Sequence, residues 1–146
     1  MFCINCFNPN TSVTNSRPHK KTPSIWRRRH CKACGHTFTT DERPRLSHTQ
    51  AVWDPKHDKT MVYNPGKLVI SIALAFGHNV AKGKESAWDL METITAILAT
   101  QFQGSLSTDD ITAVTHQTLK NFDEAAALQY AMQHQLLTST KRRRKS

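Results

Sequence analysis

The chain has four cysteines, arranged as two Cys-x-x-Cys pairs in its first quarter, and this spacing constrains the fold more than any other feature. They are Cys3, Cys6, Cys31 and Cys34. Each pair can form a turn that directs two thiolates at one ion, and four thiolates surround Zn²⁺ tetrahedrally. A complete set leaves no coordination position open to water. The sequence therefore predicts a structural zinc ion and not a catalytic one.

Two alternatives to zinc are four independent buried thiols and a redox dithiol. The first requires two accidental Cys-x-x-Cys pairs, and the second normally precedes a helix in a βαβ unit, which the sequence does not indicate. The start of the chain, MFCINC, has neither the charged end nor the apolar run of a signal peptide. With no run of eighteen apolar residues either, we expect a cytoplasmic protein without a membrane partner, and in that reducing compartment paired cysteines favour a metal.

Charge divides the chain into a basic start, a mildly acidic middle and a basic tail. Residues 1–48 carry a net charge of +7, residues 49–140 carry −3, and the tail KRRRKS adds +5. The acids in the first segment are Asp41 and Glu42 alone. Since an exposed charged face usually interleaves both signs, this imbalance predicts a polyanionic partner.

The pattern of residues predicts an α+β fold in two parts. Short antiparallel strands are expected near 11–17, 24–30 and 36–42, and a hairpin is expected from the segments 49–54 and 59–64. Helices are expected over 65–78, with Leu68, Ile72, Leu74 and Ala75 on one face, and over 84–103, with Trp88, Met91, Ile94, Ile97, Leu98 and Phe102. Two more follow, one begun by an N-cap at Ser107 with Asp110 and one that starts at Asp123-Glu124. The predicted domains are a zinc ribbon at 1–46, a mainly helical domain with an N-terminal hairpin at 49–137, and a disordered basic tail at 138–146.

A run of three arginines lies on the predicted second strand. Arginine pairs with phosphates and with guanine edges, so the predicted DNA contacts are Arg17, Arg27, Arg28, Arg29 and Lys32. His30 and His36 are expected on the surface of strands, where they can meet phosphates. For Trp26 two roles stay open, stacking on a base or shielding the metal.

The first forty-three residues resemble the zinc ribbon of the NrdR family, bacterial repressors of ribonucleotide reductase operons. That family's pattern runs Cys-x-x-Cys, a Thr-x-Val-x-Asp-Ser-Arg strand, Ser-Ile-Arg-Arg-Arg-Arg, Cys-x-x-Cys-Gly and Phe-Thr-Thr-x-Glu-Arg. The positions that match it here, besides the cysteines, are Thr11, Val13, Ser16, Arg17, Ser24, Ile25, Arg27, Arg28, Arg29, Gly35, Phe38, Thr39, Thr40, Glu42 and Arg43. The departures are Trp26 for arginine and Asn15 for aspartate.

The resemblance continues into the second part, where the family has an ATP-cone, a small hairpin-plus-helices domain that binds ATP or dATP. The last two helices match, as does the Lys67-Leu68 pair at the start of the first helix. The nucleotide-contacting turn departs from Val-x-Lys-Arg-Asp-Gly: Pro55 stands at the lysine, Lys56 at the arginine, and glycine is absent. Met61 replaces a glutamate, and Tyr63-Asn64 replaces Phe-Asp. Lys56 and Lys67 remain as the candidate nucleotide-binding residues.

The resemblance implies a divergent NrdR-like repressor, nucleoid-associated in a bacterial cytoplasm, that binds double-stranded DNA and forms a homo-oligomer under the control of ATP or dATP. One alternative is a protein-interaction module whose degenerate, non-sensing cone serves only assembly. The other is an enzyme acting on nucleic acid, with His30 beside the arginines. Because the four-thiolate site is closed and no catalytic arrangement of side chains stands out, we expect no enzyme.

Overall fold

The computed structural model describes residues 1–102 and 104–136. The chain divides into two compact units, Met1–Arg45 and a second unit that begins at Leu46. Within the described ranges, no helix has both the length and the apolar character needed to cross a membrane. The predicted tail, 138–146, lies outside the described residues.

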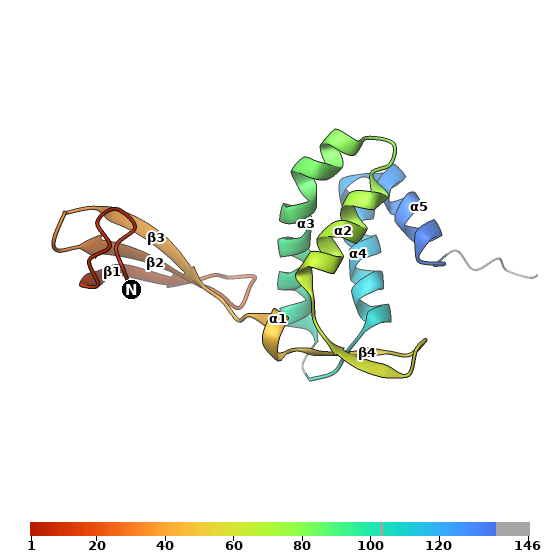
Figure 1. Cartoon of the computed structure of the whole chain (residues 1–146), viewed down its shortest axis with the longest axis horizontal. Coiled ribbons are helices and arrows are strands. Elements are labelled where there is room, and N and C mark those ends of the chain that lie inside the picture. Colours follow the sequence, from red (N-terminus) through yellow and green to blue (C-terminus); the bar gives the residue numbers. More distant parts are fainter. Residues whose placement is uncertain (103, 137–146) are drawn as a thin grey trace, which may run out of the picture. The chain divides into compact units, whose positions relative to one another are not determined.

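The first unit is a three-stranded antiparallel sheet (Figure 1). Its strands are β1 (Thr11–Pro18), β2 (Ile25–Cys31) and β3 (Thr37–Glu42), in the order β1-β2-β3. All three agree with the prediction to within one residue. The buried apolar cluster of this unit consists of Cys3, Cys31 and Phe38. So small a core cannot stabilise a sheet without a cross-link, and a bound metal is one such cross-link.

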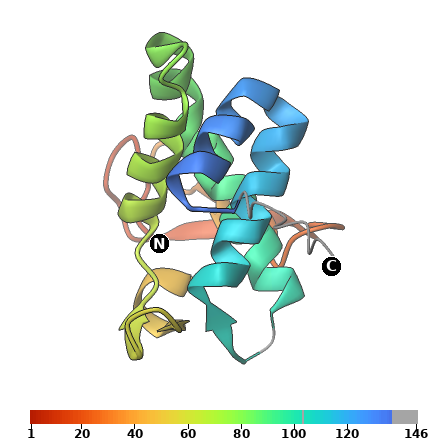
Figure 2. The same cartoon turned by 90° about the vertical axis from the view of Figure 1, so that its right-hand side faces the viewer.

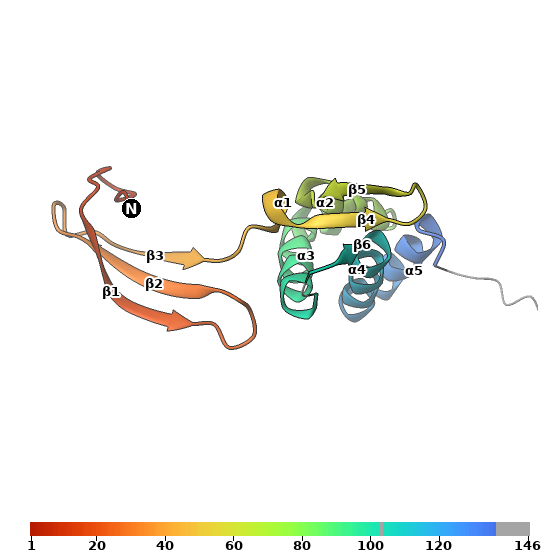
Figure 3. The same ribbon diagram turned by 90° about the horizontal axis from the view of Figure 1, so that it is seen from below.

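The second unit contains a small sheet that lies against helices (Figure 3). The predicted hairpin is present as β4 (Ala51–Asp54) and β5 (Lys59–Val62), and a short helix, α1 (Leu46–Thr49), precedes it. A two-residue strand, β6 (Leu106–Ser107), pairs in parallel with β4 and gives the order β5-β4-β6. Two residues are too few for a sequence pattern, so β6 was not predicted.

Among the described residues, four longer helices complete the second unit, and Figure 2 shows them from the side. They are α2 (Pro65–Ala75), α3 (Val80–Gln101), α4 (Thr108–Phe122) and α5 (Glu124–Gln133). The predicted capping box of α4 is confirmed, with the Ser107 hydroxyl accepting from the Asp110 amide. Helix α3 begins four residues before the predicted residue 84, because Asn79 caps it by accepting from the Lys82 amide.

Two apolar residues predicted to lie on buried helix faces are exposed instead. Leu74 on α2 is 62% exposed and Trp88 on α3 is 59% exposed. On α2 the buried positions are Leu68, Ile72 and Ala75, so Leu74 falls on the opposite side. On α3 the buried stripe runs through Ala87, Met91, Ile94 and Leu98 together with Gly83 and Leu90, and Trp88 lies beside it. The prediction followed the size of these residues more than their exact angle around the helix.

The junction between α4 and α5 is fixed by one carboxylate. Asp123 caps α5 by accepting from the Ala126 amide at 3.0 Å and also accepts from the Lys82 ammonium of α3 at 2.6 Å. The hydrogen bond from Lys82 lowers the pKa of Asp123 to about 2. Asp123 therefore stays charged at physiological pH and ties three helices together.

Helices α2 and α3 pack closely at Gly83, which gives a test of the core. A Cβ atom at this position would lie 2.6 Å from the Cβ of Phe76 and 3.2 Å from the Ala73 carbonyl oxygen. We expect Gly83→Ala to lower the free energy of unfolding by about 1–3 kcal/mol, because overpacking outweighs the gain of roughly 1 kcal/mol in helix propensity. Urea denaturation measures this, with Lys84→Ala, at an exposed neighbour, as the control. Equal stability of the Gly83 variant and the wild type would contradict the packing.

Candidate functional site

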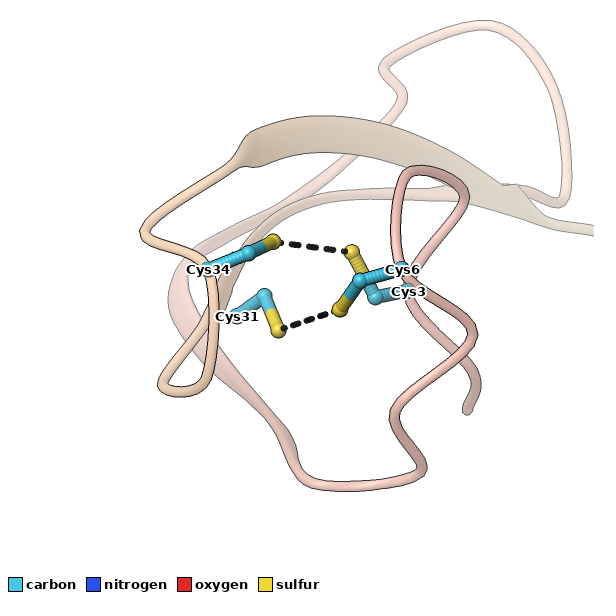
Figure 4. Close-up of side chains that lie close together, drawn as sticks. All are labelled: Cys3, Cys6, Cys31 and Cys34. Carbon is cyan, nitrogen blue, oxygen red and sulfur yellow. Dashed lines mark hydrogen bonds between the residues drawn. The ribbon is translucent and has the colours of Figure 1, made fainter.

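The two cysteine pairs lie at the ends of two loops that face each other (Figure 4). The four Sγ atoms all lie within 4.8 Å of one another, and two pairs, Cys3–Cys34 and Cys6–Cys31, are 3.7 Å apart. Tetrahedral zinc with Zn–S bonds of about 2.3 Å places its sulfurs about 3.8 Å apart. None of the four is in a disulfide. The donor atoms and their spacing fit zinc, and the four cysteines form a structural zinc site.

Both loops have the same backbone hydrogen bonds, which explains how two distant segments make one site. The Cys3 amide donates to the Asn8 carbonyl and the Phe7 amide to the Cys3 carbonyl, at 2.9 and 3.0 Å. The second loop repeats this pattern from Cys31 to His36 and from Gly35 to Cys31, both at 2.9 Å. The residue after each second cysteine has a positive φ, 56° at Phe7 and 72° at Gly35. Each loop is thus a turn closed by its own backbone, with two thiols aimed inward.

The predicted DNA-binding arginines fall on opposite faces of the ribbon, because side chains alternate along β2. On one face, the Arg27 Nε donates to Glu42 at 2.8 Å and the Arg29 Nε donates to Thr40 at 3.2 Å. Although the segment has few acids, Arg27 therefore already has one beside it. Glu42 is directly opposite Ile25, two residues along β2 from Arg27 and on the same face, and the long side chains span that distance.

The other face carries Arg28 and Arg17. Both are exposed, and among the described residues neither guanidinium has a hydrogen-bond or ion-pair partner. Lys32 is exposed in the second cysteine loop and lines an open hollow with Asn8 of the first loop. His30 lies in β2, whereas His36 precedes β3 and stacks on Phe38 with the ring centres 6.2 Å apart.

The second unit has a cavity of about 570 Å³ between its sheet and three of its helices. A volume of this size suits a small-molecule ligand. Lys56 and Lys67, the two predicted nucleotide-binding residues, both line it. Other lining residues that sequence reasoning missed are Asp54, His57, Ser71, Thr108, Asp109, Thr112, Tyr130 and His134.

The turn between β4 and β5 forms one wall of this cavity. Asp54 is buried, and its carboxylate accepts from the Lys56 amide at 3.1 Å and pairs with the His57 ring at 2.7 Å. The hydrogen bond from His57 lowers the pKa of Asp54. Although the turn has no glycine, Asp58 adopts the left-handed conformation there with φ of 49°. The turn departs from the family pattern in having no glycine, yet the hydrogen bonds of Asp54 close it, and Lys56 lines the cavity from this turn.

His134, the C-cap residue of α5, lines another wall of the cavity. The His134 Nε2 lies 2.9 Å from the Ser71 hydroxyl, and the His134 ring stacks on Tyr130 with the centres 4.2 Å apart. Burial, together with the positive charge of Lys56, lowers the pKa of His134. No sequence signal marked this residue, because two of its three neighbours, Ser71 and Lys56, come from α2 and from the turn at 55–58.

A zinc ribbon with exposed arginines, followed by a separate unit with a ligand-sized cavity, defines an α+β zinc-ribbon protein. Residues 1–42 match the family model described as "Transcriptional repressor NrdR-like, N-terminal domain". Similar proteins include the transcriptional repressor NrdR of Gluconacetobacter diazotrophicus, 31% identical over 145 residues that cover 97% of this chain and 78% of the relative. The same-named proteins of Methylorubrum extorquens and Thermus thermophilus are 31% and 27% identical and cover 90% and 97% of this chain and 69% and 89% of the relatives. The chain belongs to the NrdR family.

Proposed function

We propose that the chain is a transcriptional repressor that binds duplex DNA through the Arg28 face of its ribbon. The observation that carries this is the pair of exposed guanidinium groups, Arg17 and Arg28, on one face of a sheet that zinc holds in shape. The relatives carry names of repressors and not of enzymes, which supports the same proposal. Lys32 in the second cysteine loop adds a further cation, and binding on the bacterial nucleoid follows from this function.

A salt titration of duplex binding tests the proposal. Contacts with several phosphates release counterions, so log K should fall steeply and linearly with log salt concentration. The measurement uses the full-length protein and fluorescein-labelled duplexes, one random and one carrying a candidate operator. Weak retention that does not depend on salt would overturn the proposal and favour a ribbon that docks on an acidic protein.

We also propose that the cavity of the second unit binds ATP or dATP. A triphosphate needs cations close to it, and Lys56 and Lys67 line the same cavity from the β4–β5 turn and from α2. The apolar part of the cavity, which includes Val52, Leu68 and Ile111, can take a base. Control of the repressor by nucleotide then requires ATP and dATP to favour different assemblies.

Single lysine substitutions test the nucleotide site. Lys56→Ala and Lys67→Ala are each expected to weaken ATP and dATP binding about 10- to 100-fold, since one charge-assisted hydrogen bond contributes about 1.5–3 kcal/mol. Isothermal titration calorimetry measures the change. Lys59→Ala, on β5 but outside the cavity lining, is the matched control and should bind like the wild type. Equal losses in all three variants would indicate general electrostatics instead of a site.

The exposed apolar residues of the helices favour the second candidate function, assembly. Ile70 and Leu74 on α2 and Leu128 and Met132 on α5 are 54–62% exposed, and α2 packs against α5. We propose that this surface joins copies of the chain. Native mass spectrometry with ATP, with dATP and without nucleotide reports zinc, ligand and oligomer together. If neither nucleotide changes the size of the oligomer, the result would favour a second unit that serves assembly alone.

A further inference from the structure

Trp26 lies on the same face of the ribbon as the two exposed guanidinium groups. Side chains alternate along β2, so Trp26, Arg28 and His30 share one face. Directly opposite residues of neighbouring strands also share a face, which places Arg17 of β1 on the same face as Trp26 and next to it in the sheet. We call three directly opposite residues, one from each strand, a rung of the sheet. The next rung on the same face consists of Asn15, Arg28 and Thr39.

The metal does not explain this tryptophan. Trp26 lies five residues before Cys31 on an extended strand, a separation of about 16 Å. The buried aromatic residue beside the cysteines is Phe38, which clusters with Cys3 and Cys31. Of the two roles left open by the sequence, shielding of the zinc is therefore removed.

The chemistry of the Trp26 rung differs from that of a phosphate site. Its three members are Arg17, Trp26 and Asp41, one from each strand. Arg17 attracts a phosphate, but Asp41 is exposed, has no partner among the residues the structure describes, and repels one. A rung with a cation at one side, an acid at the other and an aromatic ring between them suits the uncharged part of a nucleotide, a base or a deoxyribose, with its phosphate on the arginine side.

We propose that Trp26 is a non-ionic nucleic-acid contact, whose indole ring packs on a base or deoxyribose of the bound DNA while Arg17 and Arg28 hold the flanking phosphates. This inference rests on the proposed function and assigns a role to a residue outside the basic set. Its signature differs from that of an arginine. Loss of the indole lowers affinity without releasing fewer counterions, so the salt dependence of binding stays constant.

The test combines salt titrations with tryptophan fluorescence on full-length, zinc-loaded protein and a labelled duplex. Trp26→Leu is expected to weaken binding about 5- to 100-fold, the range for one lost stacking contact, with the slope of log K against log salt unchanged. Trp26→Phe keeps a ring and should lose less. A Trp53→Phe, Trp88→Phe double variant leaves Trp26 as the one tryptophan of the sequence, and saturating DNA should quench its fluorescence.

Each outcome separates this inference from the proposed function. Failure of the wild type to bind DNA would overturn the proposed function. Normal binding by Trp26→Leu, or unchanged Trp26 fluorescence at saturating DNA, would overturn the inference alone. If Trp26→Leu loses zinc or its sheet, the test is the Trp26 fluorescence of the double variant: quenching by DNA supports the contact, and unchanged fluorescence overturns it. A smaller salt slope in Trp26→Leu would overturn the inference too, because it would mean that the variant disturbs the arginines.

Discussion

Removal of zinc is expected to unfold the ribbon, abolish DNA binding and leave the helices of the second unit intact. The buried apolar cluster of the first unit contains little besides two of the ligands, whereas the second unit has its own core around Ile72, Phe76, Ile94 and Leu98. Zinc bound by a small ribbon contributes on the order of 10 kcal/mol to its folding. Cys31→Ser, which removes a buried ligand, should act in the same way as a chelator.

Three measurements check this expectation together. Elemental analysis should give one zinc per chain in the wild type and none after chelation, while amide exchange should accelerate in β1–β3 alone. Circular dichroism should retain the helical signal, and added zinc should restore duplex binding. A chelated protein that binds DNA normally would contradict the structural role of the ion.

Arg28→Ala is expected to weaken duplex binding far more than Arg27→Ala, although the two residues are adjacent. The Arg28 guanidinium is exposed without a partner among the described residues, whereas that of Arg27 is already engaged by Glu42 at 2.8 Å. For Arg28→Ala we expect a loss of about 5- to 100-fold and, if it holds a phosphate, a salt slope smaller by about one. Arg27→Ala should stay within a few-fold of the wild type.

The two variants control for each other, because each removes one positive charge from the same strand. Equal losses would mean that net charge, and not the face of the sheet, determines affinity. A greater loss for Arg27→Ala would place the DNA on the opposite face. Zinc content and thermal unfolding of both variants should match those of the wild type.

Local patterns predicted the elements of this fold well, because each depends on residues close in sequence. The strand alternation around Arg28, the cap at Ser107 and the Cys-x-x-Cys turns all specify their own structure. Features that depend on partners from elsewhere were missed or wrong. Leu74 and Trp88 are large and apolar yet exposed, and only the packing of α2 and α3 shows which side of each helix is covered.

The candidate sites divide in the same way. The metal ligands follow from spacing alone, and the structure brings all four together. The alternation of the arginines between two faces follows from the strand itself, whereas the hydrogen bonds of Arg27 and Arg29 to Glu42 and Thr40 depend on the register with β3. His134 and Lys56 line the same cavity but are 78 positions apart in the sequence, so no short motif contains both.

Ser107 has two structural duties at once: it pairs with Trp53 as part of β6, and its hydroxyl caps α4. The residues that follow it, Thr108 and Asp109, belong to the cavity lining, as do Val52 and Asp54 of β4. One residue thus joins the sheet side of the cavity to its helix side, by its strand pairing and by its hydroxyl cap. A displacement of this serine would therefore move both sides of the cavity together.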